Sequence, residues 1–218
     1  MPVMIVLAID TAGTGCHAAL YDPDEDRILG AAGADIGRGH AERLMEFVDA
    51  AFDAAGLTFK DIGRIAVAIG PGSFTGIRVG VAAARGLALA LGVPAVGVST
   101  LSALAADHRA TSPLLIAMDA KRGEVYWQRF AADGTALSAP TIAALEEART
   151  LAAGHDGVIA GSASSLLRDG AQPGSDSVAI ATVARLGAGL DPADHPPKPL
   201  YLRGPDAKPQ AGFAIKRA

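Results

Sequence analysis

An internal repeat is the feature of this sequence that most constrains its fold. The stretch LAIDTAGTGCHAALYDPDEDRIL, residues 7–29, and the stretch IAMDAKRGEVYWQRFAADGTAL, residues 116–137, have the same layout. Each holds an apolar run that ends in an aspartate (Asp10 or Asp119), a turn with glycine, a second run, a turn with aspartate and a third run. Short β-branched apolar runs bounded by turns are typical of buried strands. The sequence therefore predicts two copies of an antiparallel three-stranded meander.

Helices and further strands follow both copies. A helix is predicted over residues 41–55, where apolar residues recur at helical spacing, and a second over 75–91. Between them RIAVAIG is typical of a buried strand. In the second copy a helix is predicted over 142–153, and GVIAGSAS, residues 157–164, repeats the pattern of a strand followed by a small-residue turn. The chain thus consists of two similar α/β units.

This duplication is the architecture of the actin, sugar kinase and Hsp70 (ASKHA) superfamily. In that two-lobed α/β fold each lobe is a mixed sheet with an antiparallel meander plus helices, and ATP lies in the cleft between the lobes. We expect a first lobe over residues 1–100 and a second over 101–191. Residues 192–218 are rich in proline and charge, so they are expected to form an irregular tail in which residues 200–202 pack locally.

Composition and charge narrow the function classes. Half of the 218 residues are hydrophobic, enough for a sizeable core, and the net charge of -4 disfavours nucleic-acid binding by this chain alone. Cys16 is the only cysteine; this excludes an intramolecular disulfide, fits a reducing compartment and suggests a buried apolar side chain. The apolar start MPVMIVLAID is too short to span a membrane and lacks the basic flank of a signal peptide. We expect a soluble, cytoplasmic protein.

The turns after the two aspartates are the candidate nucleotide contacts. The first, DTAGTG, would suit phosphate or metal, which makes Asp10 and Thr11 candidates; the other interpretation is that Asp10 caps the N–H groups of its own turn. The second, DAKRG, puts Lys121 and Arg122 where the backbone would have to approach a phosphate. GPGSFTGIRVG lacks the lysine of a P-loop. We therefore expect no independent ATP hydrolysis and no intrinsic cofactor.

No constellation of metal ligands or catalytic residues stands out in the sequence. The histidines are isolated, with no pair spaced to put two ligands on one helical face: His17, His40, His108, His155 and His195. Ser73 lies in GPGSF, which lacks the G-x-S-x-G pattern of a hydrolase elbow. We expect neither a metal site nor a catalytic residue.

The turn in GPGSFTGIRVG and the helix after it raise the question of docking. The structural turn is expected at Gly70, Pro71, Gly72, Ser73, Phe74 and Thr75. Small residues then recur every four positions along one helix face: Gly76, Gly80, Ala84 and Ala88. Glycine inside a helix costs about 1 kcal/mol relative to alanine, so this stripe needs a reason such as close approach of another backbone. Packing on the chain's own sheet and docking of a partner are both open at this point.

Several segments together resemble the TsaB family, also called YeaZ. They are LAIDTAGTGCHAAL, GHAERLMEFVDAAF, IGPGSFTGIRVGVAAARGLALALGVPAVGVSTL, MDAKRGEVYWQRF and PLYLRGPDAKPQ. The most specific is GPGSFTGIRVG followed by P-x-x-G-V-S-T-L, and residues 138–195 are the least diagnostic. The resemblance implies a non-catalytic subunit of the bacterial machinery that installs N6-threonylcarbamoyladenosine (t6A) at adenosine 37 of tRNAs reading codons that begin with A.

The resemblance also implies partners. TsaB-like proteins pair with the catalytic paralogue TsaD through the two first-lobe helices, here 41–55 and 75–91, and can form homodimers through the same surface. The small ATPase TsaE joins the pair, ATP or ADP can bind near the junction, and tRNA is reached only through the complex. The partner-binding candidates in this chain are Leu44, Phe47, Val48, Ala51, Gly76, Arg78, Gly80, Ala84 and Arg85. If they form a docking surface, Gly80→Leu should abolish the heterodimer and leave the monomer folded.

Two positions separate this chain from the catalytic paralogue. TsaD carries a metal-binding His-x-x-x-His where this chain has Thr100 and Leu104. The alternative function is an enzyme of the ASKHA superfamily, a small-molecule kinase or ATPase or a peptidase; the cationic second turn and the missing histidine pair both weigh against it. Lys121 and Arg122 either contact tRNA phosphates locally or form a solvated hairpin tip.

Overall fold

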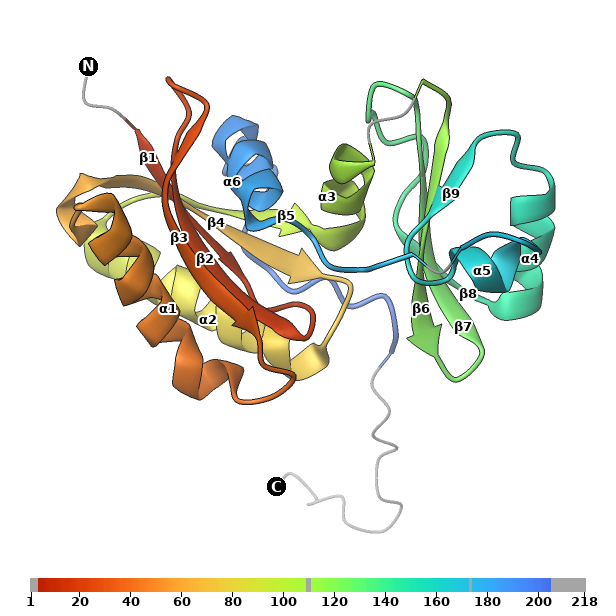
Figure 1. The fold of residues 1–218 in the computed structure, drawn as a ribbon, viewed down its shortest axis with the longest axis horizontal. Coiled ribbons are helices and arrows are strands. Elements are labelled where there is room, and N and C mark those ends of the chain that lie inside the picture. Colours follow the sequence, from red (N-terminus) through yellow and green to blue (C-terminus); the bar gives the residue numbers. More distant parts are fainter. Residues whose placement is uncertain (1–3, 109–110, 173, 205–218) are drawn as a thin grey trace, which may run out of the picture.

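A computed structural model describes residues 4–108, 111–172 and 174–204 and contains two sheets (Figure 1). The first has the order β3-β2-β1-β4-β5, with β1 Ile5–Asp10, β2 Gly15–Asp22, β3 Arg27–Asp35, β4 Ile62–Gly70 and β5 Ala95–Ser99. The second has the order β8-β7-β6-β9, with β6 Leu114–Lys121, β7 Glu124–Phe130, β8 Thr141–Ala144 and β9 Val158–Ala160. In both sheets an antiparallel meander continues through a parallel pair, so the predicted duplication is confirmed.

Helices and sheets alternate in layers (Figure 1). The outer face of the first sheet is covered by α1 His40–Ala55 and α2 Phe74–Leu91, and a short 3-10 turn, η1 Phe59–Asp61, lies between α1 and β4. Between the sheets lie α3 Thr100–Asp107 and α6 Ile180–Gly189. The far side of the second sheet is covered by α4 Leu145–Ala153 and α5 Ser164–Leu167. This layered arrangement confirms the predicted two-lobed α/β fold.

Burial on both faces explains why β1 is apolar throughout. All six of its residues are buried. Leu7 and Ile9 belong to the core under α1 and α2, whereas Val6 and Ala8 belong to the core around α3 and α6. A strand covered on both sides has no solvent face, so hydrophobic residues occupy successive positions instead of alternating ones.

The second repeat differs from its prediction in two elements. The third strand, expected before residue 137, is β8 at Thr141–Ala144, and residue 136 makes only an isolated bridge to Phe130. The helix predicted over 142–153 is correspondingly shorter and begins at Leu145. The β-branched residues Thr141 and Ile142 pair with the first half of β7, and this pairing outweighs the local helical pattern.

The expected lobe boundaries are wrong for α6. Residues 180–189 were expected in the second lobe, but α6 packs on β1, β2, β4 and β5 of the first sheet. The contact is close, because a Cβ on Gly187 would lie 2.2 Å from the Cβ of Ala66 on β4. The chain therefore returns to the first lobe after completing the second.

The described part of the tail contains no helix or strand, but it is attached to the first sheet. The Gly97 N–H on β5 donates to the His195 carbonyl at 2.9 Å, and the Leu200 N–H donates to the Ile69 carbonyl on β4 at 2.9 Å. Within residues 192–204 the tail therefore contacts the middle of β5 and the carboxyl end of β4. The rest of the predicted tail, 205–218, lies outside the described residues.

Candidate functional site

The turn between β4 and α2 is shorter than the one predicted over residues 70–75, because Gly70 is the last residue of β4, and Phe74 and Thr75 already belong to α2. Residues 71–73 join the two elements and lie against the first hairpin turn. Gly70 has a φ of 98°, in the region that favours glycine. A Cβ on Gly72 would lie 2.2 Å from the Ala12 carbonyl oxygen, and the Ser73 N–H donates to that oxygen at 2.7 Å. Ser73 also caps α2, because its hydroxyl accepts from the Gly76 N–H at 3.2 Å. This glycine-rich turn is therefore explained by close packing within the chain.

The small-residue stripe of α2 also packs on its own lobe. Gly76, Gly80 and Ala84 are buried, and a Cβ on Gly76 would lie 2.0 Å from the Thr11 carbonyl oxygen. The Thr11 hydroxyl donates to the Gly76 carbonyl at 2.7 Å. The packing therefore contradicts the partner-binding assignment of Gly76 and Gly80, because Thr11 occupies the space beside them, and Ala84 is buried in the same core.

The apolar candidates on α1 face inward as well. Leu44, Val48 and Ala51 are buried in the core between α1 and the first sheet, and Phe47 is partly buried against it. The helical spacing that singled these residues out is the pattern of a helix packed on a sheet. For the three buried residues a direct partner contact is excluded by that packing.

The outward face of α2 remains open. Only five of its 18 residues are buried. Its mean hydropathy of 1.4 makes it long and apolar enough to cross a membrane, although this is a test of length and composition only and core helices of soluble proteins pass it. Arg78, Ala82, Arg85 and Leu89 are exposed and share one side of the helix, with Leu89 86% exposed. Of the predicted docking residues, Arg78 and Arg85 therefore remain available.

The exposed side of α1 is acidic, unlike the exposed side of α2. α1 and α2 lie side by side on the first sheet (Figure 1). α1 exposes four acidic residues, Glu42, Glu46, Asp49 and Asp53, and one cation, Arg43, which pairs with Glu46 at 2.5 Å. α2 contains no acidic residue. The two-helix face is therefore acidic along α1 and cationic and apolar along α2.

A second candidate region is the cleft between the two sheets. Its volume is about 1250 Å³, and it is lined by the first hairpin turn, the GPGSF turn, the second hairpin turn and the tail. β1, β4 and β5 are parallel, as are β6 and β9, so the carboxyl ends of these strands face the cleft. Crevices at the carboxyl ends of parallel strands are the usual ligand sites of open α/β sheets.

Asp10 lines this cleft, whereas Thr11 does not. The Asp10 carboxylate accepts from the Ala12 N–H at 2.8 Å, so it caps its own turn. Desolvation raises the pKa of Asp10, opposed by the Ala12 hydrogen bond and more weakly by His17 and His40. Thr11 is fully buried and bonded to α2, which makes its assignment as a nucleotide contact wrong.

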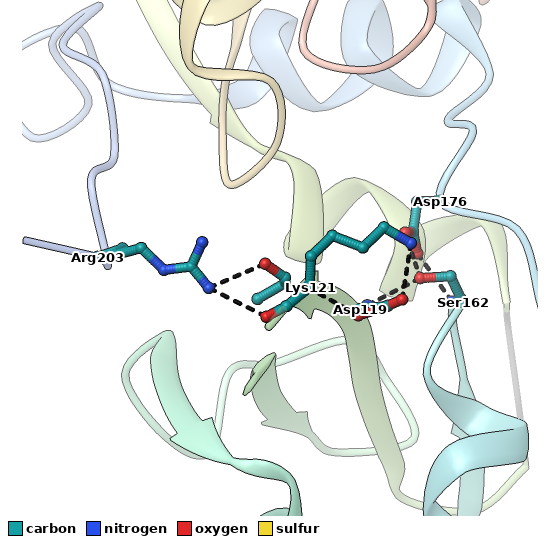
Figure 2. Close-up of polar contacts among 6 residues, drawn as sticks. Asp119, Lys121, Ser162, Asp176 and Arg203 are labelled. Atoms are coloured by element: carbon teal, nitrogen blue, oxygen red, sulfur yellow. Dashed lines mark hydrogen bonds and ion pairs between the residues drawn. The ribbon is translucent and has the colours of Figure 1, made fainter. Parts of the chain in front are cut away.

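The second hairpin turn is occupied by the chain's own charges (Figure 2). The Asp119 carboxylate accepts from the Lys121 N–H and from Lys121 Nζ, both at 2.7 Å, and the Lys121 ammonium lowers the pKa of Asp119. Arg203 from the tail donates to the Ala120 carbonyl at 2.9 Å and to the Lys121 carbonyl at 3.3 Å, and it pairs with Glu124. The Ala120 and Lys121 carbonyls and the Lys121 N–H of this turn are thus already used in contacts within the chain.

Ser162 and Asp176 join this cluster and were not singled out from the sequence (Figure 2). The Asp176 carboxylate accepts from the Ser162 N–H at 2.8 Å and from the Ser162 hydroxyl, and that hydroxyl accepts from the Asp119 N–H at 2.8 Å. Desolvation raises the pKa of Asp176. The repeated GSAS turn points to Ser162, but nothing local to the sequence connects it with Asp176.

Thr100 and Leu104, which the resemblance aligned with the expected histidine pair of TsaD, lie in different environments. Thr100 lines the cleft, and its buried hydroxyl makes no hydrogen bond within the described residues. Leu104 is buried in the core around α3 and α6. Over residues 4–108, 111–172 and 174–204, no group of three or more histidine, cysteine or acidic side chains is placed to hold a metal ion.

Comparisons with known proteins relate the chain to t6A biosynthesis. Residues 30–204 match the family model described as TsaD, tRNA N6-adenosine threonylcarbamoyltransferase. An uncharacterized protein of Mycobacterium tuberculosis is 37% identical over 214 residues, which cover 96% of each chain. The tRNA threonylcarbamoyladenosine biosynthesis protein TsaB of Escherichia coli is 38% identical over 133 residues, which cover 60% of this chain and 56% of that protein.

A solved structure extends this similarity to the fold. YeaZ from Pseudomonas aeruginosa matches with a TM-score of 0.72 and 27% identity, over 91% of this chain and 100% of that chain. A second Pseudomonas aeruginosa structure, of a protein described as similar to peptidase YeaZ, matches with a TM-score of 0.73 and 28% identity over 92% of this chain and 100% of that one. By sequence and by fold, this chain is a member of the TsaB (YeaZ) family.

Proposed function

We propose that this chain is the non-catalytic subunit that binds and activates TsaD in the threonylcarbamoylation of adenosine 37. The observation that carries the proposal is the open face of α2, an apolar helix with Arg78, Arg85 and the 86% exposed Leu89 on its outer side. Exposed apolar surface of this kind, beside charged groups, marks protein interaction sites. Its place on a TsaB-family fold makes a TsaD-type protein the natural partner.

Activation by such a subunit is a shift between two conformations of the partner. Binding favours whichever state of TsaD makes better contacts with the α1 and α2 face. Moving TsaD from 1:99 to 99:1 in favour of its active state needs about 5.5 kcal/mol of preference. An interface of standard size, burying about 1,600 Å² in total, is large enough to supply this.

The second hairpin turn favours a non-catalytic role over an ASKHA-type kinase or ATPase. Lys121 neutralises Asp119, and Arg203 holds the two carbonyls where a phosphate would have to approach. A peptidase is the other alternative, and Ser162 is the hydroxyl to consider for it. Ser162 ties the Asp119 and Asp176 segments together with both its donor and its acceptor capacity, which is a structural use of that hydroxyl.

The remaining parts of the proposal concern the assembly. TsaE joins the pair, ATP or ADP binds at the junction of the complex without an intrinsic cofactor in this chain, and tRNA is contacted through the complex. When TsaD is absent, the same helical face forms a homodimer. A single cysteine, which cannot form an intramolecular disulfide, fits the cytoplasmic assembly that we propose.

The test is a reconstitution with the cognate TsaD, TsaE and adenylate-forming enzyme, supplied with threonine, bicarbonate, ATP and unmodified tRNA. We expect t6A, and a heterodimer on gel filtration, only when this chain is present. Undiminished t6A without it would overturn the proposal. ATP or peptide turnover by this chain alone would instead favour the enzyme alternative.

A further inference from the structure

A groove lies between the outer face of α2 and the tail. Arg78, Val81, Ala82 and Arg85 of α2 form one side, and Pro199 and Tyr201 of the tail form the other. Its volume is about 570 Å³. Val81, Ala82 and Pro199 are the apolar lining residues, and Arg78 and Arg85 are the cationic ones. The tail, which was expected to be irregular, thus completes a surface on the proposed partner-binding helix.

The tail wall of this groove is held in place on both sides. The Tyr201 hydroxyl accepts from Arg78 Nε at 2.8 Å, and the Tyr201 ring lies 5.1 Å from the Phe74 ring. The Leu200 N–H is bonded to β4, and Arg203 is bonded to the second hairpin turn (Figure 2). Because residues 199–201 of the tail are already held by these contacts, they lose little conformational entropy when a ligand binds against them.

The charges of the groove are only partly used within the chain. Arg78 stacks on the Phe74 ring, with its guanidinium carbon 3.9 Å from the ring centre. Arg85 makes no hydrogen bond or ion pair with any residue that the structure describes. No acidic residue lines the groove. Two guanidinium groups seven residues apart, about 10 Å along a helix axis, therefore face a cavity without a counter-charge.

We propose that this groove receives an acidic side chain carried by a helix of the TsaD-type partner, with Arg85 as its main counter-charge and Tyr201 as its wall. The inference rests on the proposed function and adds the chemistry of the contact. A protein helix fits better than RNA, because the lining includes apolar residues and the exposed side of α2 continues to Leu89, which is highly exposed. Arginine pairs with carboxylate through two parallel hydrogen bonds, which fixes the register of the two helices.

The experiment measures the affinity of the full chain for its cognate TsaD by calorimetry. We expect Arg85→Glu to weaken binding by about tenfold or more, because it reverses the charge. Arg85→Lys should weaken binding less than this but still measurably, because lysine keeps the charge and loses the two parallel hydrogen bonds. Tyr201→Ala, which removes the wall, should also weaken binding. The matched control is Arg129→Glu, an exposed arginine on β7 of the other lobe, which should bind as the unmodified chain does. Unchanged unfolding midpoints exclude loss of the fold as the cause.

A charge swap identifies the occupant. Replacing the acidic residues of the docking helix of TsaD one at a time by lysine should reveal one position that restores binding to Arg85→Glu. If the unmodified chain binds TsaD and Arg85→Glu binds equally well, this inference is wrong while the proposed function stands. If Arg85→Glu instead keeps the heterodimer but abolishes tRNA binding by the complex, the groove belongs to RNA. If the unmodified chain does not bind TsaD, both proposals fail.

Discussion

Thr11 and Gly80 are in contact at the junction of β1 and α2: a Cβ on Gly80 would lie 2.4 Å from Thr11 Oγ1. The Thr11 hydroxyl has no room to retreat, because it is buried and donates to the Gly76 carbonyl. This contact explains why α2 tolerates glycine in its interior. It also reverses the expectation that a large residue at position 80 would leave the monomer intact.

Gly80→Ala should destabilise the protein. Overpacking of a tight core costs about 1–3 kcal/mol, which exceeds the gain of about 1 kcal/mol that alanine brings to a helix interior. The matched control is Gly86→Ala in the same helix, where an added Cβ meets no atom within 4 Å and the helix gain should appear alone. Urea unfolding of both variants measures the difference, and equal stabilisation of the two would show that α2 is not packed on Thr11.

The repeat and the helical spacing were enough to predict most of the first lobe, because strands and helices there follow local patterns. The stripe of Gly76, Gly80 and Ala84 could not be interpreted from sequence, since close approach to the chain's own backbone and close approach to a partner require the same residues. The structure decides by placing Thr11 in that space. Sequence periodicity identifies a packed face but not the surface that packs on it.

Contacts between distant segments account for what the sequence did not predict. Ser162 with Asp176, and Arg203 with Ala120, pair residues 14 and 83 positions apart, without a spacing rule that connects them. The sequence also did not show which sheet α6 packs on, because its apolar face could pack on either one. Only the fold brings these residues together, so the composition of the cleft was the least predictable part of the candidate site.

Cys16 should be unreactive in the folded protein. Its side chain is fully buried on β2, and desolvation, with a smaller effect of Asp10, raises the pKa of the thiol to about 11. The thiolate is the reactive form, so burial and pKa act in the same direction. We expect no reaction with a thiol reagent at pH 8 until denaturant is added, followed by one equivalent. Fast labelling without denaturant would show that the first sheet opens locally.

The substitution Asp10→Asn should increasingly stabilise the protein, relative to the unmodified chain, as the pH rises. Burial raises the pKa of Asp10 above its ordinary value of 3.8, so the folded state binds this proton more tightly than the unfolded state does. Stability from this group is therefore fully present below pH 3.8 and is lost as pH rises through the folded pKa. Asparagine keeps an oxygen that accepts from the Ala12 N–H, and because it does not ionise, it causes no loss of stability as pH rises. Between pH 4 and pH 8 the free energy of unfolding of the variant should rise relative to that of the unmodified protein. The opposite trend would mean that the fold stabilises the ionised carboxylate.

Arg203→Ala should loosen the second hairpin turn without unfolding either sheet. Arg203 is the described tail residue that reaches Ala120, Lys121 and Glu124, and its side chain is 26% exposed. Hydrogen bonds to a charged group contribute about 1.5–3 kcal/mol when buried, and partial exposure reduces this to about 1 kcal/mol. Hydrogen exchange should therefore become faster over residues 119–124 and at the Leu200 N–H.

Arg27→Ala is the control, because the ion pair of Arg27 with Glu25 is more than half exposed on both sides and should contribute almost nothing. Equal exchange in the two variants would mean that the tail does not hold the lobes together.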